Sequence, residues 1–314
     1  MSLGGILQPA CSSAVPAPSL QAAPGTLVHD GRMDPDARAP LDTALLRDLL
    51  CEPHGPLRRL HVVETSESTN SELAAGVAAD PQAWPAPALL VAEHQVAGRG
   101  RAGRSWATPA RAALTASLLV RPQVPRERLG WLPLLAGLAT VTALRSTLGV
   151  HAVAKWPNDV LVLTDGPEVE GWGRLRKIAG ILTEVLPDGV VIGVGLNVSQ
   201  TREELPVPTA VSVAQVGGAS IDRTVILTAL AEASVSVLGR WTEAAGDVHA
   251  SGLAEEVAAV SATVGASVRV ELADGTELRG TATGLAADGA LLVEDASGTV
   301  RTVHTGDVYH LRLN

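Results

Sequence analysis

Residues 93–106 read EHQVAGRGRAGRSW, and they follow an apolar run at residues 88–92 that predicts a buried strand. Glycines let the backbone turn tightly and bring its N–H groups close to a ligand. Guanidinium groups supply forked donors that match phosphate or carboxylate oxygens. Trp106 adds a flat face on which a base can stack. The stretch therefore predicts an anion-binding loop.

A solvated loop or a disordered RNA-binding tail is the alternative explanation of a short Gly/Arg run. Residues 112–120 form a second apolar run directly after it, which predicts another core strand. Because the run connects two core elements, it is a loop and not a tail, which favours the anion site.

Length and composition limit the classes of protein. The 314 residues suffice for one large domain and a small one, and no apolar run approaches the ~18 residues that span a bilayer. The net charge of −9 argues against a surface that binds nucleic acid broadly. Two cysteines, Cys11 and Cys51, make a disulfide framework or a cysteine metal site improbable. The first 31 residues lack Lys and Arg, unlike a secretory signal, so we expect a cytoplasmic protein without a membrane segment.

Lysine is unusually scarce in this chain. Phe is absent and Tyr occurs once, while Ala, Gly, Arg, Val and Pro are abundant, which indicates pressure from a GC-rich genome. Lys155 and Lys177 are the two lysines, against 22 arginines. Since arginine serves equally well as a solvated charge, a retained lysine indicates a need for a compact ammonium group.

Periodicity predicts the main elements. Residues 1–40, rich in Ala, Pro, Ser and Gly, are expected to be a disordered extension, with Met33 as an alternative start. The expected helices are residues 41–51, with Asp42 as N-cap, and residues 71–79, 129–148 and 222–241. The expected strands, besides the two around the Gly/Arg run, are residues 61–64, 153–162 with a turn at Pro157, 177–184 and 190–198.

Polar residues precede the helix expected at 71–79. Ser68, Thr69 and Asn70 stand at its N-terminus, where they either cap the helix, with Glu72 near the capping-box position, or hydrogen-bond a polar ligand. Capping and ligand binding are compatible.

A second polar group interrupts the strand at residues 153–162. Lys155, Asn158 and Asp159 lie within five residues between apolar runs. Buried polar groups must be paired, so these side chains either satisfy one another or face a ligand. The coincidence of two rare residue types favours the ligand.

The last fifty residues differ in character. Short strands are expected at residues 267–272, 278–284, 290–294, 300–304 and 308–313, separated by Asp-Gly and Ser-Gly turns. This pattern predicts a small SH3-like barrel.

Residues 177–184 and 190–198 are expected to form an antiparallel hairpin, after an exposed loop at 164–176.

Five motifs occur in a fixed order, and together they closely resemble biotin protein ligases. The motifs are ESTN at 67–70, EHQVAGRGRAGRSW at 93–106, KWPND at 155–159, KIAGIL at 177–182 and GVGLN at 193–197. The resemblance covers roughly residues 60–314. It implies an α+β fold, a mixed sheet with flanking helices, as a catalytic domain at residues 41–260, followed by the SH3-like domain at 261–314.

The resemblance also implies a two-step reaction. Biotin and MgATP would give biotinyl-5'-AMP and pyrophosphate, and biotin would then pass to one lysine of a biotin carboxyl carrier protein. Joining two anions requires positive charge at the reacting centre, which suits the arginines and lysines of the motifs.

Site residues follow from the motifs. The resemblance implies that biotin is bound by Ser68, Thr69, Asn70, Gln95, Arg99, Gly100, Arg101, Lys177 and Gly180. It implies that ATP is bound by Arg101, Arg104, Trp106, Asn158 and Asn197. Lys177, Arg101 and Asp159 would be catalytic, with Asp159 accepting a proton from the incoming lysine. The resemblance assigns no residue to a metal.

Other expectations concern the Gly/Arg loop and the ends of the chain. Residues 98–104 are expected to be mobile without ligand and to order over the adenylate, excluding water. Ala102 stands where relatives often have Arg, and the 164–176 loop is longer than is common. Relatives that repress transcription carry an N-terminal DNA-binding domain, which we do not expect here, so we expect no operator binding.

Two rival functions remain. A lipoate or octanoate ligase shares the catalytic fold but needs an extended apolar channel and lacks the Gly/Arg series. A non-catalytic RNA binder would use the Gly/Arg run and the barrel as surfaces, but the acidic charge and few aromatic residues oppose it.

Overall fold

The computed structural model describes residues 38–272 and 275–310. The expected N-terminal extension lies, up to residue 37, outside this part. Arg38 is buried, forms an ion pair with Glu204 (2.6 Å) and donates to the Ser199 carbonyl at 3.2 Å. The described chain thus begins with a segment anchored to the body of the protein.

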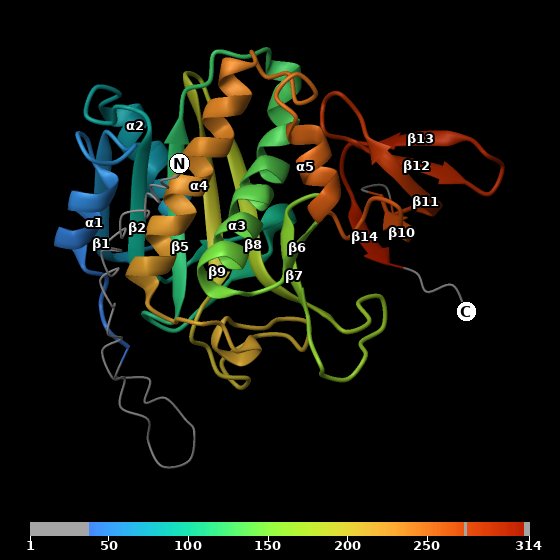
Figure 1. Ribbon diagram of the computed structural model, residues 1–314, viewed down its shortest axis with the longest axis horizontal. Coiled ribbons are helices and arrows are strands. Elements are labelled where there is room, and N and C mark those ends of the chain that lie inside the picture. The colour runs from blue at the N-terminus through green and yellow to red at the C-terminus, as the bar shows by residue number, and fades with distance from the viewer. Residues whose placement is uncertain (1–37, 273–274, 311–314) are drawn as a thin grey trace, which may run out of the picture. The chain divides into compact units, whose positions relative to one another are not determined.

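A seven-stranded mixed sheet organises the larger part of the molecule (Figure 1), in the order β1-β2-β5-β9-β8-β7-β6. Its strands are β1 (Arg59–Ser66), β2 (Ala88–Gln95), β5 (Ala113–Val120), β6 (Ala152–Lys155), β7 (Asp159–Leu163), β8 (Leu175–Leu186) and β9 (Gly189–Asn197). The pair β1 and β2 is parallel, and the other neighbours are antiparallel. The predicted mixed sheet and the 177–198 hairpin are confirmed.

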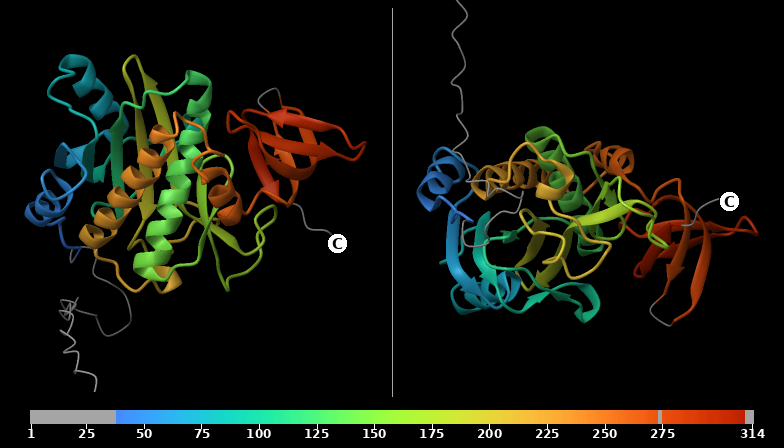
Figure 2. Two further views of the ribbon diagram at one scale, coloured as in Figure 1. Left: turned by 45° about the horizontal axis from the view of Figure 1, so that its top comes forward. Right: turned by 90° about the horizontal axis from the view of Figure 1, so that it is seen from below.

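Helices cover both faces of this sheet. They are α1 (Thr43–Leu50), α2 (Thr69–Ala79), α3 (Leu132–Leu148), α4 (Arg223–Glu243) and α5 (Leu253–Val260). Alternate strand residues face opposite ways. Leu118 and Ile192 join the core cluster that contains α3 and α4, whereas Leu119 and Val191 join the one that contains α2. Figure 2 shows the long helices as a layer against the sheet.

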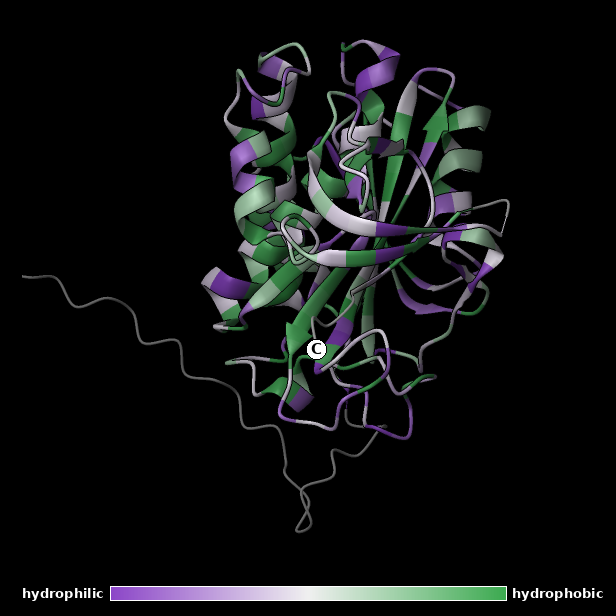
Figure 3. Ribbon diagram, turned by 90° about the vertical axis from the view of Figure 1, so that its right-hand side faces the viewer, coloured by the Kyte–Doolittle hydropathy of each residue, from purple (hydrophilic) through white to green (hydrophobic). Residues whose placement is uncertain are grey.

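Two helical segments of the described chain are long and apolar enough to cross a bilayer by length and composition. They are Arg126–Leu148, which contains α3, and Arg223–Glu243, which is α4. In this structure they pack against each other and against the sheet, and most of α3 is buried. In Figure 3 the central strands are largely green and the loops carry more purple. Core packing therefore accounts for the apolar character of α3 and α4.

Helix ends follow local chemistry. Asp42 caps α1 by accepting a hydrogen bond from the Leu45 N–H (2.9 Å), as predicted. Asp222 caps α4 in the same way, accepting from Thr224 N–H at 2.8 Å. The expected helix at 129–148 begins instead with a 3-10 segment, Arg126–Trp131. The helix α5 was not predicted; it has eight residues and no side-chain cap.

The C-terminal sheet is antiparallel and five-stranded, in the order β13-β12-β11-β10-β14. Its strands are β10 (Ser267–Glu271), β11 (Glu277–Leu285), β12 (Leu291–Asp295), β13 (Val300–Val303) and β14 (Asp307–His310). The predicted SH3-like domain is confirmed. Residues 311–313 of the last predicted strand lie outside the described part.

Two buried tryptophans fix this small sheet to the larger one. The Trp131 indole N–H donates to Ala287 O, and that of Trp156 donates to Gly289 O, each at 3.0 Å. Gly130 lies so close to Asp288 O that a Cβ there would overlap it. The β11–β12 turn is thus seated on the segment before α3, which makes the small sheet a fixed wall beside the larger one.

Candidate active site

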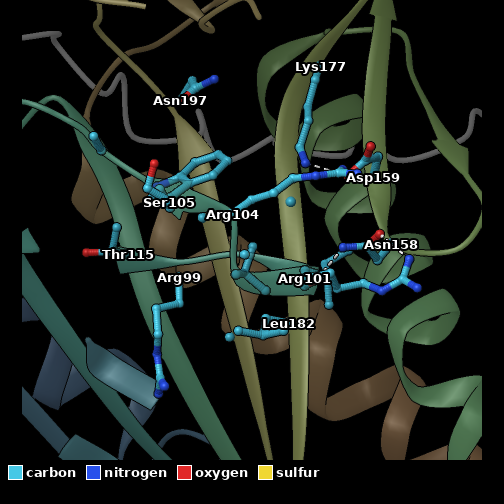
Figure 4. Close-up of a pocket in the computed structure, with 18 of the residues that line it drawn as sticks. Arg99, Arg101, Arg104, Ser105, Thr115, Asn158, Asp159, Lys177, Leu182 and Asn197 are labelled. Atoms are coloured by element: carbon cyan, nitrogen blue, oxygen red, sulfur yellow. Dashed lines mark hydrogen bonds and ion pairs between the residues drawn. The ribbon is translucent and has the colours of Figure 1, made fainter. Parts of the chain in front are cut away.

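A cavity of about 490 Å³ lies on the α2 face of the seven-stranded sheet. Every residue predicted for the site lines it: Ser68, Thr69, Asn70, Gln95, Arg99, Gly100, Arg101, Arg104, Trp106, Asn158, Asp159, Lys177, Gly180 and Asn197. Motifs more than one hundred residues apart in the sequence therefore meet in one place (Figure 4).

One end of the cavity is polar and uncharged. Gln95 Oε1 accepts hydrogen bonds from Thr69 N–H (2.9 Å) and Thr69 Oγ1 (3.1 Å). The Ser117 hydroxyl lies 2.8 Å from Thr69 Oγ1 and 2.7 Å from Asn70 Oδ1, and Asn70 Nδ2 donates to Leu182 O at 3.1 Å. We name Ser68, Thr69, Asn70, Gln95 and Ser117 the neutral end; all five are buried.

The prediction that the Ser68 side chain caps the helix α2 is wrong. Ser68 occupies the N-cap position of α2 in extended conformation, but its side chain makes no capping hydrogen bond. Thr69 uses its hydroxyl on Gln95. Ser68 is one of the residues that line the cavity.

Two glycines of β9 let the cavity walls approach the sheet. Gly193 and Gly195 lie on the same face of the strand, because they are two residues apart. A Cβ at Gly193 would overlap Asn70 Oδ1, and one at Gly195 would lie 2.6 Å from Trp106 Cε2. Asn70 and Trp106 therefore occupy the space that the missing side chains leave.

The Gly/Arg stretch forms a small hairpin of β3 (Gly98–Arg99) and β4 (Ser105–Trp106) around a 3-10 turn, Arg101–Gly103. A Cβ at Gly98 would overlap the Gln95 amide. Gly103 has φ +73°, and Ala102 has φ 53°, a conformation that costs about 1 kcal/mol or more for a residue with a Cβ. The mobility of residues 98–104 without ligand stays a prediction.

The three arginines of this hairpin point to different partners (Figure 4). Arg99 hydrogen-bonds Ser71 and lies 3.7 Å from Glu184 Oε1, so its guanidinium stands away from the other two. Arg101 donates to Asn158 Oδ1 at 3.3 Å and to Thr305 Oγ1 at 3.0 Å. The guanidinium of Arg101 thus reaches Asn158 and the C-terminal segment, whereas that of Arg99 turns toward α2.

The small C-terminal sheet supplies partners to this hairpin. Arg104 forms an ion pair with Asp307, the first residue of β14. Burial lowers the pKa of Arg101, an effect that Asp307 and Asp159 partly oppose and Arg104 increases. Thr305 and Asp307 give no local sequence signal, since only the folded arrangement brings them to the arginines.

Opposite charges face each other beyond the arginines. Lys177 Nζ lies 2.5 Å from Asp159 Oδ1 and 5.9 Å from the centre of the Trp106 ring. Lys177 and Asp159 come from neighbouring strands, β8 and β7. Figure 4 shows Lys177 and Arg104 both extending toward Asp159. We name Arg101, Arg104, Lys155, Lys177, Asp159 and Asp307 the charged end.

The two predicted asparagines are fixed by backbone contacts. Asn158 Nδ2 donates to Ile181 O at 2.7 Å, and Asn197 Nδ2 donates to Val211 O at 3.1 Å. Gln200 Nε2 donates to Asn197 Oδ1 at 2.9 Å. Both amides are therefore held rigidly in the cavity wall.

Glu93, the first residue of the quoted stretch, serves the fold. Its carboxylate is buried, lies 2.5 Å from Arg223 Nη2 and accepts from Leu41 N–H at 2.6 Å. Burial lowers the pKa of Arg223, and the hydrogen bond that Arg223 donates to Glu93 opposes this. The pair joins β2, α4 and the segment before α1.

Metal ligation has little support among protein side chains. Within residues 38–272 and 275–310, no group of three His, Cys, Asp or Glu side chains could hold an ion. The carboxylates that line the cavity, Asp159 and Asp307, are paired with Lys177 and Arg104.

The chain is similar to known proteins over most of its length. The profile of the biotin/lipoate A/B protein ligase family matches residues 64–197, and that of the biotin protein ligase C-terminal domain matches residues 263–311. A biotin–[acetyl-CoA-carboxylase] ligase of Mycobacterium tuberculosis is 40% identical over 279 residues, which are 88% of this chain and 97% of the relative. The chain belongs to the biotin protein ligase family. The predicted family and enzyme class, a ligase, are confirmed.

More distant members of the biotin protein ligase family are also similar to the chain, in sequence or in structure. The bifunctional ligase/repressor BirA of Escherichia coli is 38% identical over 148 residues, 45% of this chain and 42% of that protein. The Aquifex aeolicus biotin protein ligase in complex with biotin and ATP has a TM-score of 0.64 at 24% identity, covering 82% of this chain and all of the other. That last likeness supports the fold.

Proposed function

We propose that this ligase couples biotin to ATP, giving biotinyl-5'-AMP and pyrophosphate, and then transfers biotin to a lysine of a biotin carboxyl carrier protein. The observation that carries the proposal is the division of one cavity into a neutral and a charged end. Biotin has a ureido group, which needs neutral donors and acceptors, and a carboxylate, which needs cations. ATP adds a base and a polyphosphate.

The neutral end suits the ureido ring. Ser68, Thr69, Asn70 and Gln95 are proposed to bind it, since they offer both donors and acceptors in a buried wall. Gly180 leaves room for the Lys177 side chain, since a Cβ there would lie 3.0 Å from Lys177 Nζ, and Gly180 is proposed to line the biotin site beside that ammonium. A lipoyl chain has no ureido group, and hydrogen-bonding groups left unpaired would oppose its binding.

The charged end suits the reaction itself. Lys177 is proposed to lie between the biotin carboxylate and the α-phosphate, with Arg101 and Arg104 on the phosphates. Trp106, Asn158 and Asn197 are proposed to fix the base and sugar. Arg99 and Gly100 would close over biotin when the hairpin orders around the ligand. Mg²⁺ would enter with ATP, bound mainly by the phosphates.

Asp159 is proposed to act in the second step. While it pairs with Lys177 at 2.5 Å, its Oδ1 is engaged. A bound carboxylate or phosphate would compete for Lys177 and release Asp159. The released carboxylate would then accept the proton that the attacking lysine amine loses.

The test is biotin-dependent exchange of pyrophosphate into ATP, with lipoate as comparator, followed by mass analysis of an apo carrier domain. We expect exchange with biotin, about 100-fold weaker exchange with lipoate, and one biotinyl addition on a carrier lysine. Exchange with lipoate in preference to biotin would overturn the substrate assignment. Salt-sensitive RNA binding without exchange would overturn the enzymatic proposal.

A further inference from the structure

Both lysines of the chain converge on one carboxylate. Lys177 Nζ lies 2.5 Å from Asp159 Oδ1, and Lys155 Nζ lies 4.0 Å from Asp159 Oδ2. The chain holds 22 further cations as arginine, so the chance meeting of its two lysines at one aspartate is improbable. The site therefore holds a second ammonium group that the assignments above leave without a role.

Lys155 is placed by a short hairpin. It ends β6 and pairs in register with Asp159, which begins β7. Its side chain is 8% exposed, and its ammonium lies 5.2 Å from the centre of the Trp172 ring. The hairpin and the ring thus hold Lys155 in the cavity wall.

The fold alone gives a poor reason for this buried charge. A buried ammonium needs a close anion, and the nearest carboxylate oxygen, at 4.0 Å, belongs to a group already paired with Lys177. Burial lowers the pKa of Lys155, and the positive charges of Lys177 and Arg104 lower it further. The negative charges of Asp159 and Asp307 oppose this shift. An additional anion beside Lys155 would relieve the cost of its burial.

The position of Lys155 matches a polyphosphate. One carboxylate group separates the two ammonium groups, so they can meet successive phosphates when those replace Asp159. Arg104 and Asp307 line the same end of the cavity. Lys155 is therefore one of the few cations of this end that can offset the nucleotide charge that Mg²⁺ leaves.

We propose that Lys155 binds the departing pyrophosphate portion of the nucleotide, an assignment that rests on the adenylation function proposed above. A biotin carboxylate oxygen forms a bond to the α-phosphorus. The bond from that phosphorus to the oxygen bridging the β-phosphate breaks, and its electron pair leaves with pyrophosphate. The Lys155 ammonium offsets the charge that grows on this leaving group. No proton transfer is needed in this step.

Measuring the two half-reactions separately distinguishes pyrophosphate binding by Lys155 from a purely structural role. Adenylation is measured as biotin-dependent pyrophosphate exchange, and transfer as biotinylation of a carrier domain from supplied biotinyl-5'-AMP. Pyrophosphate takes part in the first and is absent from the second. For Lys155→Met we expect exchange to fall about 100-fold in kcat/KM for ATP while transfer stays within about 3-fold. The matched variant Lys177→Met is expected to lose both.

Further variants guard against misfolding. Lys155→Arg keeps the charge in a wider group, and we expect about a 10-fold loss in exchange with transfer unchanged. The KM for pyrophosphate in the exchange assay should be lower for wild type than for Lys155→Arg. Equal losses in both half-reactions, or exchange near that of wild type in Lys155→Met, would overturn the role of Lys155. Absence of biotin-dependent exchange in wild type would instead overturn the proposed function.

Discussion

The neutral and charged ends of the cavity are built on different principles. At the neutral end, hydrogen bonds link Thr69 to Gln95, Ser117 to Asn70, and Asn70 to Leu182 O. At the charged end, Lys177 and Arg104 pair with Asp159 and Asp307. The neutral end is buried and held by neighbouring backbone, whereas the Arg104 side chain is 63% exposed and its partner lies in the C-terminal sheet.

The difference indicates how each end receives its ligand. Neutral groups fixed by their neighbours are preorganised, so a ligand meets donors and acceptors already in position. Paired ions must change partners, because an anionic ligand takes the cations from Asp159 and Asp307. We therefore expect substitutions at the neutral end to change binding of biotin, and those at the charged end to change the rate.

The largest effect is expected at Lys177, where the two ends meet. Lys177→Met removes the cation proposed to lie between the carboxylate and the α-phosphate, and we expect kcat/KM for exchange to fall about 1000-fold. Lys177→Arg keeps the charge but changes its shape, and we expect a loss of about 10- to 100-fold. Pyrophosphate exchange measures both.

Biotin binding provides the control for Lys177. Calorimetric titration without ATP should give Kd values for both variants within about 10-fold of wild type, because most contacts of biotin would be with the neutral end. Near-wild-type exchange by Lys177→Arg would contradict the need for a compact ammonium. Loss of biotin binding with the fold intact would contradict the division between the ends.

The next effect separates the binding of biotin from the binding of ATP on one strand, β9. Gly193→Ala places a methyl group against Asn70, and Gly195→Ala places one against Trp106. Because the Asn70 side chain is short and buried, it cannot move aside without breaking its hydrogen bonds. We expect Gly193→Ala to raise KM for biotin about 30-fold and Gly195→Ala to raise KM for ATP by a similar factor. Steady-state exchange kinetics measure both.

A glycine elsewhere gives the matched control. Gly239 lies in α4, and a Cβ there would meet nothing within 4 Å. Gly239→Ala should leave both KM values unchanged and stabilise the protein by about 0.5–1 kcal/mol, seen as a higher Tm. If Gly193→Ala and Gly195→Ala raised the same KM, the assignment of Gly193 to the biotin site and of Gly195 to the ATP site would be wrong.

Much of this arrangement was open to prediction because local chemistry decides it. Asp42 caps α1 since a carboxylate before an apolar helical pattern satisfies free N–H groups. Asp-Gly turns marked the hairpins of the small sheet. The predicted site residues came from motifs, and Gly193 and Gly195 belong to one of these motifs, residues 193–197.

The remainder depends on contacts between distant segments. Asp307 and Thr305 meet the arginines only because Trp131 and Trp156 seat the small sheet beside the larger one. The resemblance grouped Arg99 with Arg101 at the biotin site, yet the hairpin turns the Arg99 guanidinium toward Ser71. No pattern along the chain encodes such side-chain directions, since they follow from the packed fold.

The smallest effect is expected at Ser117, which supports the neutral end from β5. Its hydroxyl lies 2.7 Å from Asn70 Oδ1 and 2.8 Å from Thr69 Oγ1, and one proton can serve one acceptor at a time. Ser117→Ala leaves both groups less firmly held, so we expect KM for biotin to rise about 5-fold, the effect of about 1 kcal/mol. KM for ATP should stay unchanged. The control is Ser234→Ala, which removes a buried hydroxyl that bonds Leu230 O within α4. An equal rise of KM for biotin in the two variants would mean that lost stability, and not the support of Asn70 and Thr69, explains the effect.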